Sequence, residues 1–319
     1  MNPISMQLLA LRPNGVIRSA GGSVQEFTSS GKRRYFKVVC STDGLKIAAY
    51  VQDGYIYTSN DDGANFVQCT SVGAKSWDNL VCSADGLTIV ATDTTQNIYI
   101  STNGGANFVV RTGLSLLYQN TNNPTVLAIS SDSSTIFFEQ GGWLYITTDY
   151  GVSFVEHRLS STLDLGACSA DGSKIILATY DGHVHTSTNG GASFVERIIG
   201  SGPTFGTAWS SLACSADGLT IFASRYGGYI YKSTDGGENF IACESAGIRF
   251  WRDISCSADG LRVIALQYGF QYIYTSTDGG SSFVERSEIP NQSFISVACS
   301  ANGLKAFLVV NDSINRLIL

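Results

Sequence analysis

Short runs of apolar and β-branched residues alternate with polar, glycine-containing turns along the whole chain. Near the C-terminal end the runs read YIYTS (272–276), SFVERS (282–287), FISVACS (294–300) and KAFLVV (305–310). The segments that join such runs, typically ADG or TDGG, contain residues that tolerate positive φ. This pattern predicts four β-strands, which we call A to D, in each of several similar units.

Two sequence signatures mark each unit. The first, Ser/Thr-x-Asp/Asn-x-Gly-x-x-Phe, has a decayed copy that ends at Phe27 and six complete copies, which start at Ser59, Ser101, Thr147, Ser187, Ser233 and Ser276. The second is an apolar strand that runs into Cys-Ser-x-Asp/Asn-Gly; its cysteine position is held by Cys40, Cys82, Ile129 (as a replacement), Cys168, Cys214, Cys256 and Cys299. The units are about 43 residues apart, which is typical of propeller blades. The sequence therefore predicts an all-β, single-domain protein over residues 1–319, a seven-bladed β-propeller of four-stranded antiparallel blades.

The two ends of the chain complement each other. The last unit stops after its C strand, whereas residues 23–27 match a D strand that has no A strand before it. We expect these two ends to pair, because this closes the ring and leaves no open sheet edge. Residues 7–11 and 16–19 are further strand candidates that the pattern does not place.

The first signature resembles the Asp-box, or BNR, repeats of sialidase-like propellers, and its copies span nearly the whole chain. The resemblance implies a structural turn between strands C and D. In that turn the hydroxyl and carboxylate bind amides, the glycine takes positive φ, and the aromatic ring plugs the core. The structural residues are then Asp61, Asn103, Asp149, Asn189, Asp235 and Asp278. Calcium binding is the alternative, but the cluster of oxygen ligands that calcium needs is missing.

The lengths of the connections separate two faces of the predicted disc. From each cysteine position to the next Ser/Thr signature there are 18 to 20 residues, whereas from each signature Phe to the next cysteine position there are 13 to 21. Variation is therefore concentrated in the D to A connections, which share one face with the B to C connections. Variable loops on a rigid scaffold are where binding usually resides.

Aromatic residues are frequent on this variable face. Five of them stand five positions before the cysteine position: Tyr35, Trp77, Trp209, Trp251 and Phe294. Two interpretations stay open: the rings pack between adjacent blades, or they form a partly exposed circle that stacks on sugars or anchors a protein partner. Further candidates for ligand binding on this face are Tyr118, Trp143, Phe205, Tyr226, Phe250, Tyr268, Phe270, Arg225, Arg249, Arg252, Asp78, Asp164 and Asp253.

The cysteines and histidines predict structural roles. Six of the eight cysteines occupy the same position on strand A of different blades, which we expect to be too far apart for disulfides, so they are interpreted as small buried thiols. His183 and His185 share one face of a strand, as a metal pair requires, but sister blades carry tyrosine pairs in these places. We expect no metal and no cofactor.

Composition and charge narrow the classes of partner. The net charge of −6 and pI of about 5.0 argue against nucleic acid. The sequence contains no apolar stretch long enough to predict membrane insertion. Its N-terminal residues do not match a signal peptide. Reduced cysteines fit synthesis in the cytoplasm and leave the final localisation open, including a virion or an exported assembly.

The resemblance to sialidases raises an enzymatic interpretation as well. Sialidases use three arginines, a Tyr nucleophile with an acidic partner and an Asp acid/base, and typically carry an Arg-Ile-Pro motif, which this sequence lacks. Asp78, Asp164 and Asp253 are candidate glycosidase carboxylates, but their near-equivalent repeat positions favour shared architecture. We therefore expect no catalysis, and glycoside hydrolysis is the least favoured function.

The sequence-based hypothesis is a recognition module. It predicts a lectin-like or receptor-binding propeller that engages a glycan or glycoprotein through its variable, aromatic-rich face. The alternative is a scaffold that binds other protein subunits, as do Asp-box propellers that help to build photosystem II.

Overall fold

The computed structural model describes residues 16–19, 22–95, 97–111, 125–159, 162–199, 208–269, 272–287, 289 and 292–319. The described part is built from β-strands and two short 3-10 helices, η1 (Thr28–Ser30) and η2 (Glu244–Ala246). No helix within it is long and apolar enough to cross a bilayer. The first strands are β1 (Val16–Ser19), β2 (Gly22–Glu26), β3 (Tyr35–Cys40), β4 (Ile47–Val51), β5 (Ile56–Ser59), β6 (Val67–Gln68), β7 (Trp77–Cys82), β8 (Ile89–Asp93), β9 (Ile98–Ser101), β10 (Val109–Arg111), β11 (Thr125–Ile129), β12 (Ile136–Gln140), β13 (Trp143–Thr147) and β14 (Val155–Arg158). The others are β15 (Leu163–Cys168), β16 (Ile175–Thr179), β17 (Val184–Ser187), β18 (Val195–Arg197), β19 (Trp209–Cys214), β20 (Ile221–Gly228), β21 (Ile230–Ser233), β22 (Ile241–Ala242), β23 (Arg249–Cys256), β24 (Val263–Gln267), β25 (Ile273–Ser276), β26 (Val284–Glu285), β27 (Phe294–Cys299), β28 (Lys305–Val310) and β29 (Ser313–Ile318).

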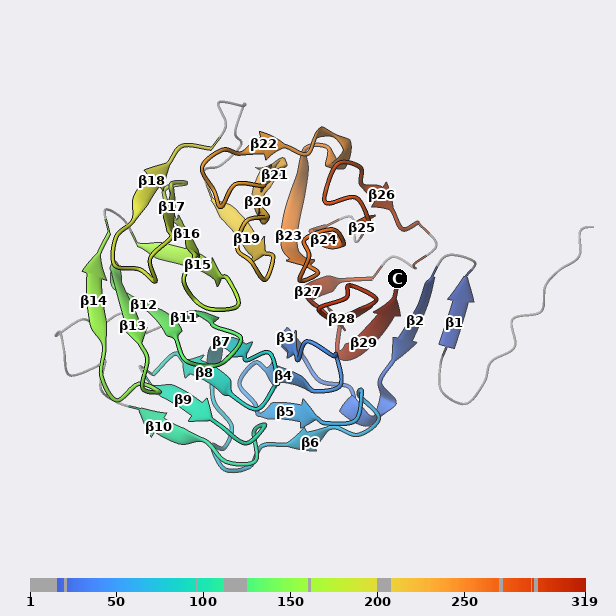
Figure 1. The fold of residues 1–319 in the computed structure, drawn as a ribbon. Helices are drawn as coiled ribbons and strands as arrows, with labels where there is room; N and C mark the ends of the chain where they lie inside the picture. The colour runs from blue at the N-terminus through green and yellow to red at the C-terminus, as the bar shows by residue number, and fades with distance from the viewer. Residues whose placement is uncertain are drawn as a thin grey trace, which may run out of the picture.

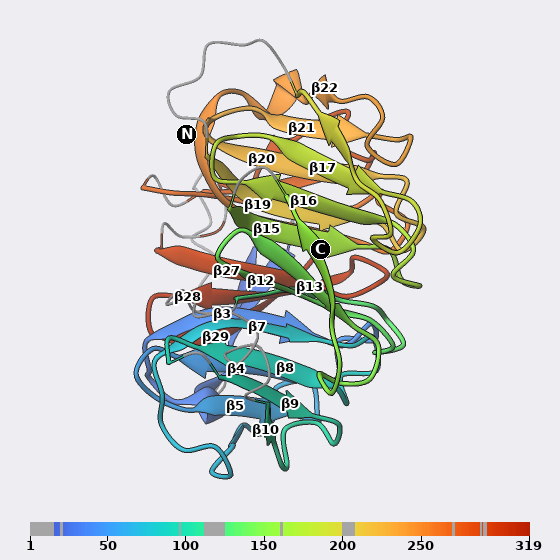
Figure 2. The ribbon, with the colours of Figure 1, turned by 90° about the vertical axis from the view of Figure 1, so that its left-hand side faces the viewer.

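The strands form repeated antiparallel sheets. β3–β6, β7–β10, β11–β14 and β15–β18 are four-stranded sheets in sequential order. β19–β22 and β23–β26 repeat this arrangement and are joined into one eight-stranded sheet through β20 and β23. Figure 1 shows the sheets arranged around a central axis, and Figure 2 shows the same disc from the side. The first strand of each unit lines the central channel.

The chain ends close the ring as the sequence predicts. β2 pairs antiparallel with β29, from Ser23 opposite Ile318 to Glu26 opposite Asn315. β29 continues through β28 to β27, so the N-terminal strand completes the last sheet (Figure 1). Residues 16–19, which the sequence left unplaced, form β1 and pair with β2 at the outer edge. The candidate strand at residues 7–11 lies outside the described residues.

A closed circle of backbone hydrogen bonds joins the units at the channel. Each N–H donates to the carbonyl of the equivalent residue in the next unit, two positions after the cysteine position, at 2.8 to 3.0 Å. The circle runs through Thr42, Ala84, Ser131, Ala170, Ala216, Ala258 and Ala301, which donates back to Thr42. These seven bonds satisfy backbone groups that would otherwise face each other unpaired.

The Ser/Thr-x-Asp/Asn turns have the geometry expected for a structural role. Ser233 Oγ donates to Asp235 Oδ1 (2.7 Å) and accepts the buried N–H of Gly237 (2.9 Å). Asp235 Oδ1 in turn accepts the N–H of Asn239 (3.0 Å), and the hydrogen bonds from the Asn239 amide and Ser233 hydroxyl lower the pKa of Asp235 to about 2. The same three bonds occur in all six copies, including those with Asn103 and Asn189.

Glycine is required in this turn for space as well as conformation. Gly237 has φ of 90°, and a Cβ at this position would lie 2.6 Å from Thr186 Cγ2 in the neighbouring sheet. The turn therefore packs directly against the preceding unit.

A second, equally regular turn follows each A strand. Ser215 Oγ donates to Asp217 Oδ1 (2.5 Å) and accepts the Thr220 N–H (3.0 Å), while Asp217 Oδ1 accepts the Leu219 N–H (2.9 Å). Equivalent serine and acidic or Asn pairs stand in the other units at Ser41, Ser83, Ser130, Ser169, Ser257 and Ser300. Both turn types are thus fixed by side-chain hydrogen bonds to the backbone.

We expect Ser233→Ala to lower the free energy of unfolding by about 1–3 kcal/mol, because it leaves the buried Gly237 N–H without an acceptor. Urea denaturation with an unchanged m-value measures this loss. Ser233→Thr is the matched control, since Thr147 makes the same bonds in its own turn. A Ser233→Ala variant as stable as the parent would contradict the structural role of this hydroxyl.

Candidate binding site

The five periodic aromatic residues lie in the core. Tyr35, Trp77, Trp209, Trp251 and Phe294 are each at most 4% exposed, and they belong to clusters between neighbouring sheets. Two of the indoles also donate to backbone carbonyls of the preceding unit, Trp77 to Gly54 (2.9 Å) and Trp209 to Gly182 (3.0 Å). The interpretation as an exposed circle that stacks on a ligand is therefore wrong, because burying each ring between units removes it from solvent. The packing interpretation is correct.

Three other aromatic residues on the variable face are exposed and touch one another. The exposed fractions are 42% for Tyr226, 42% for Phe250 and 48% for Tyr268. The ring centroid of Tyr226 lies 5.0 Å from that of Phe250 and 6.1 Å from that of Tyr268. The guanidinium carbon of Arg252 lies 5.4 Å from the centroid of Tyr268. We call these four residues the aromatic patch.

Backbone pairing holds the aromatic patch in place. β20 and β23 are eight residues long, longer than the equivalent strands of the other units, and their extensions pair with Tyr226 opposite Phe250. The N–H of Tyr268 donates to the carbonyl of Phe250 (2.7 Å), and Arg252 Nε donates to the carbonyl of Ile295 (3.0 Å). The patch is thus a preformed surface that spans two units.

The remaining predicted site residues do not join the aromatic patch as exposed groups. Arg225 is buried with its guanidinium carbon 4.5 Å from the centroid of the Trp209 ring. Trp143 lies in β13, where the guanidinium carbon of Arg158 is 5.5 Å from its ring centroid. Tyr118, Phe205 and Phe270 lie outside the described residues.

Asp253 is a structural cross-link. Its Oδ1 accepts from Ser211 Oγ (2.7 Å) and its Oδ2 accepts the Val297 N–H (2.9 Å), so it ties together the three inner strands β19, β23 and β27. The residue is buried. The prediction that Asp253 orients a ligand is not supported by this geometry, because both oxygens are engaged within the protein.

Three carboxylates in consecutive units influence one another electrostatically. Asp78 accepts from Thr125 Oγ1 (2.7 Å), and loss of surrounding water raises its pKa although part of the residue stays exposed. Partial desolvation and the negative charge of Asp78 raise the pKa of Asp164, although this residue is exposed. Glu139, which no repeat pattern singled out, is buried and accepts the Gly142 N–H (2.8 Å). Burial, with the charges of Asp78 and Asp164, raises its pKa to about 7.

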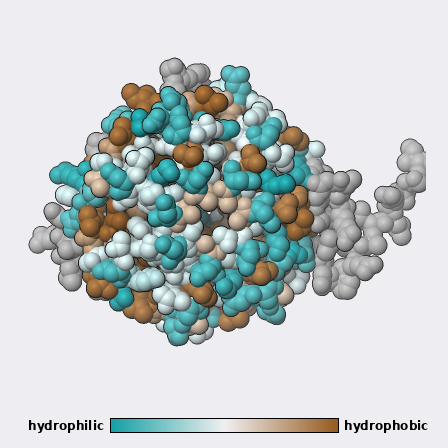
Figure 3. Space-filling model, in the orientation of Figure 1, coloured by the Kyte–Doolittle hydropathy of each residue, from teal (hydrophilic) through white to brown (hydrophobic). Residues whose placement is uncertain are grey.

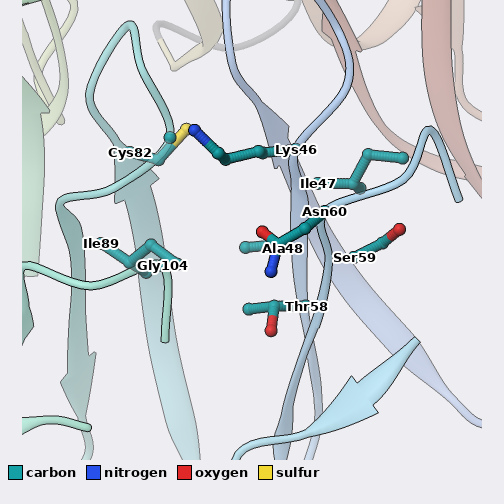
Figure 4. A pocket seen from close by; sticks show the side chains of 10 residues that line it. Lys46, Ile47, Ala48, Thr58, Ser59, Asn60, Cys82, Ile89 and Gly104 are labelled. Atoms are coloured by element: carbon teal, nitrogen blue, oxygen red, sulfur yellow. The ribbon is translucent and has the colours of Figure 1, made fainter. Parts of the chain in front are cut away.

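Two further hollows are the central channel and a crevice between neighbouring sheets. The central channel encloses about 320 Å³ and is walled by the inner strands, with six of the eight free cysteines along it. Figure 4 shows a crevice between two sheets, across which Lys46 extends toward the strand of Cys82. Its volume is about 10 Å³, so it holds one water at most. On the face seen in Figure 3, hydrophobic residues are scattered among hydrophilic ones and form no broad patch.

His183 and His185 occupy different environments. His183 Nδ1 lies 2.6 Å from Glu196 Oε1 at the surface, whereas His185 is buried and desolvation lowers its pKa. No cluster of three or more His, Cys, Asp or Glu side chains in the described part of the chain is arranged to hold a metal ion.

No protein-family model and no curated protein matches this chain. Among solved structures it is similar to YCF48 from Cyanidioschyzon merolae, with 12% identity, 92% of this chain and 98% of that chain covered, and a TM-score of 0.69. The fold is a β-propeller. Virginiamycin B lyase from Staphylococcus aureus is similar too, at 16% identity, 93% and 98% coverage, and a TM-score of 0.71. So is YCF48 bound to D1 peptide, at 11% identity, 96% and 99% coverage, and a TM-score of 0.70.

We expect Glu139→Gln to change the pH dependence of stability. Between pH 4.5 and about 7 the unfolded chain releases the Glu139 proton while the folded chain keeps it, so the free energy of unfolding falls as pH rises. This raised pKa corresponds to a loss of about 3 kcal/mol. The variant does not titrate, so it should exceed the parent in stability by up to about 3 kcal/mol at pH 8 and match it at pH 4.5. Denaturant unfolding at both pH values tests this, and an equal difference at both would refute it.

Proposed function

We propose that this chain is a non-catalytic, seven-bladed β-propeller that binds a protein partner through the aromatic patch. The observation that carries the proposal is that Tyr226, Phe250 and Tyr268 keep 42 to 48% of their surface exposed while contacting one another. Aromatic and arginine side chains on a rigid surface are the residue types that dominate binding energy at protein interfaces.

Preorganisation supports this role. The patch is pinned by the β20–β23 pairing and by the Tyr268 to Phe250 hydrogen bond, so little conformational entropy is lost when a partner orders it. Arg252 adds a positive charge beside the rings in a chain of net charge −6. This combination fits a partner segment with apolar and acidic side chains.

The neighbouring structures support a protein partner more than a glycan. Solved structures similar to this chain include YCF48 bound to D1 peptide and a component of the mitotic checkpoint complex. The lectin-like hypothesis relied on a circle of exposed rings, and those rings are buried. The exposed rings of Tyr226 and Tyr268 suit a glycan as well as a protein, so the neighbouring structures are what favours a protein partner.

The repeat supports the finer assignments. The circle of seven backbone hydrogen bonds, one from each unit, supports a count of seven blades. The six identical Ser/Thr-x-Asp/Asn turns support membership of the Asp-box propellers. The engagement of both Asp253 oxygens supports a binding function without catalysis.

Selection from a displayed library of random peptides on the immobilised protein tests the proposal. We expect enriched peptides that lose at least about tenfold in affinity for Phe250→Ala, because truncating a central aromatic hot spot of an interface costs about 2 kcal/mol or more. Calorimetric titration of one synthesised peptide against both proteins measures the loss.

Tyr180→Ala is the matched control for this experiment. Tyr180 is 71% exposed on the β16–β17 connection of the same face, outside the patch, so its removal should leave peptide affinity unchanged. Enriched peptides that bind Phe250→Ala as tightly as the parent would refute the assigned surface. Patch-dependent binding on a glycan array with no enriched peptide would favour the lectin-like function instead.

A further inference from the structure

A pocket of about 430 Å³ opens beside the aromatic patch, within the size range of ligand sites. It lies where the β20–β23 pairing meets strands β24 to β26 of the next unit. Its walls include Phe250 from the patch, Ile248, Tyr272 and Tyr274, and its polar residues are Arg249, Gln267 and Glu285. Of these polar residues, only Arg249, which stands beside Phe250, was a ligand-binding candidate from the sequence.

Gln267 brings an unpaired acceptor to this pocket. The residue is only 5% exposed, and its Oε1 is buried without a hydrogen-bond partner. Asp93 ends the equivalent strand β8, where its carboxylate accepts the hydroxyl of Tyr99 (2.8 Å) and the N–H of Thr95 (2.9 Å). In the pocket the equivalent hydroxyl, that of Tyr274, donates to Glu285 Oε2 instead (2.6 Å). The repeat thus supplies no internal donor to Gln267 Oε1, and leaving such an atom unpaired is costly.

An unpaired donor lies on the strand next to Gln267. Trp251 is the cross-strand partner of Gln267, and its Nε1 is buried without a hydrogen-bond acceptor. The indoles of Trp77 and Trp209 both donate to a backbone carbonyl, so this absence sets Trp251 apart from them. One unpaired acceptor and one unpaired donor therefore occupy paired residues at this junction.

The charges at the pocket balance. The Arg249 guanidinium carbon lies 4.5 Å from the ring centroid of Tyr274, and its Nε donates to the carbonyl of Ala246 (2.9 Å). Glu285 is engaged by the Tyr274 hydroxyl. A charged ligand group would upset this balance, whereas a neutral group that both donates and accepts hydrogen bonds would not.

We propose that this pocket binds a carboxamide side chain, that of Asn or Gln, presented by a peptide segment of the partner. Its NH₂ group donates to Gln267 Oε1 and its carbonyl accepts from the Arg249 guanidinium, while the aromatic walls cover its methylene groups. Phe250 belongs to both the pocket and the aromatic patch, so one bound segment reaches both. The proposal rests on the proposed function for its peptide source, but the pocket is tested without any partner.

Nuclear magnetic resonance of the indole N–H groups tests this inference. The chain has four tryptophans, so its ¹⁵N spectrum shows few indole signals, and Trp251→Phe assigns that of Trp251. The probes are N-acetylglutamine methylamide, N-acetylglutamate methylamide and N-acetylmethionine methylamide, which share backbone amides and differ in the side chain. We expect the glutamine probe to shift the Trp251 signal in a saturable way, at least about tenfold tighter than the other two, with the Trp77 and Trp209 signals unmoved.

Two variants link the signal to the pocket. Gln267→Met keeps the length of the side chain but removes the acceptor, and we expect it to abolish the preference for glutamine. Gln267→Glu places a negative charge there, and we expect it to favour N-acetyllysine methylamide. An unchanged melting temperature shows that a variant folds. If Gln267→Met does not fold, the probe preference of Gln267→Glu tests the pocket instead.

Several results would overturn the inference. Equal shifts from all three probes, no shift at millimolar concentration, or a glutamine preference that survives in both variants would each do so. A shift caused by N-acetylglucosamine but not by the glutamine probe would reject the peptide source. If the probes fail but the selected peptides depend on the aromatic patch, only the pocket is rejected. If the glutamine probe binds but no selected peptide depends on the patch, the patch is rejected as the binding surface.

Discussion

The closed circle of backbone hydrogen bonds around the channel is the constraint on which the rest of the structure depends. Each unit donates to the next and accepts from the one before, so no unit can tilt or slide without breaking bonds to both neighbours. The β2–β29 pairing applies the same constraint at the outer part of the last sheet and joins the two ends of the chain. With closure fixed, the strands of every unit meet their neighbours at the same depth, and equivalent residues face equivalent surroundings.

That equivalence explains where the hydrophobic core lies. The large clusters lie between sheets, and five of them contain the aromatic residue that begins an A strand. The Ser/Thr-x-Asp/Asn turns pack against these clusters from the neighbouring unit, because the glycine of each turn contacts the preceding unit. Function is consequently expected where the repeat is broken, since an exact copy has its polar groups paired and its rings covered.

The sequence predicted the strands, the pairing of the two chain ends and the structural turns, because these depend on local residue chemistry repeated at a fixed period. It could not decide whether Trp77 or Trp251 is exposed, because a periodic aromatic residue is compatible with either a covered or an open position. Tyr226 and Tyr268 were found because they stand outside the period. Glu139 and Gln267 were missed, because their environments arise from residues of other strands and other units that only the folded chain brings together.

The junction of β20 and β23 shows how a broken repeat creates a surface. The extensions of β20 and β23 pair through their backbones at a place where other units have an irregular connection. This pairing holds Tyr226 and Phe250 in exposed positions. The same extensions adjoin Gln267 and Trp251, which lack the hydrogen bonds that Asp93 and Trp77 make in their own unit. Exposed rings and unpaired buried atoms both raise the free energy of the isolated chain, and at this junction the three exposed rings lie beside two such atoms. Two independent costs at the same place support the proposed partner, which would remove both when it binds.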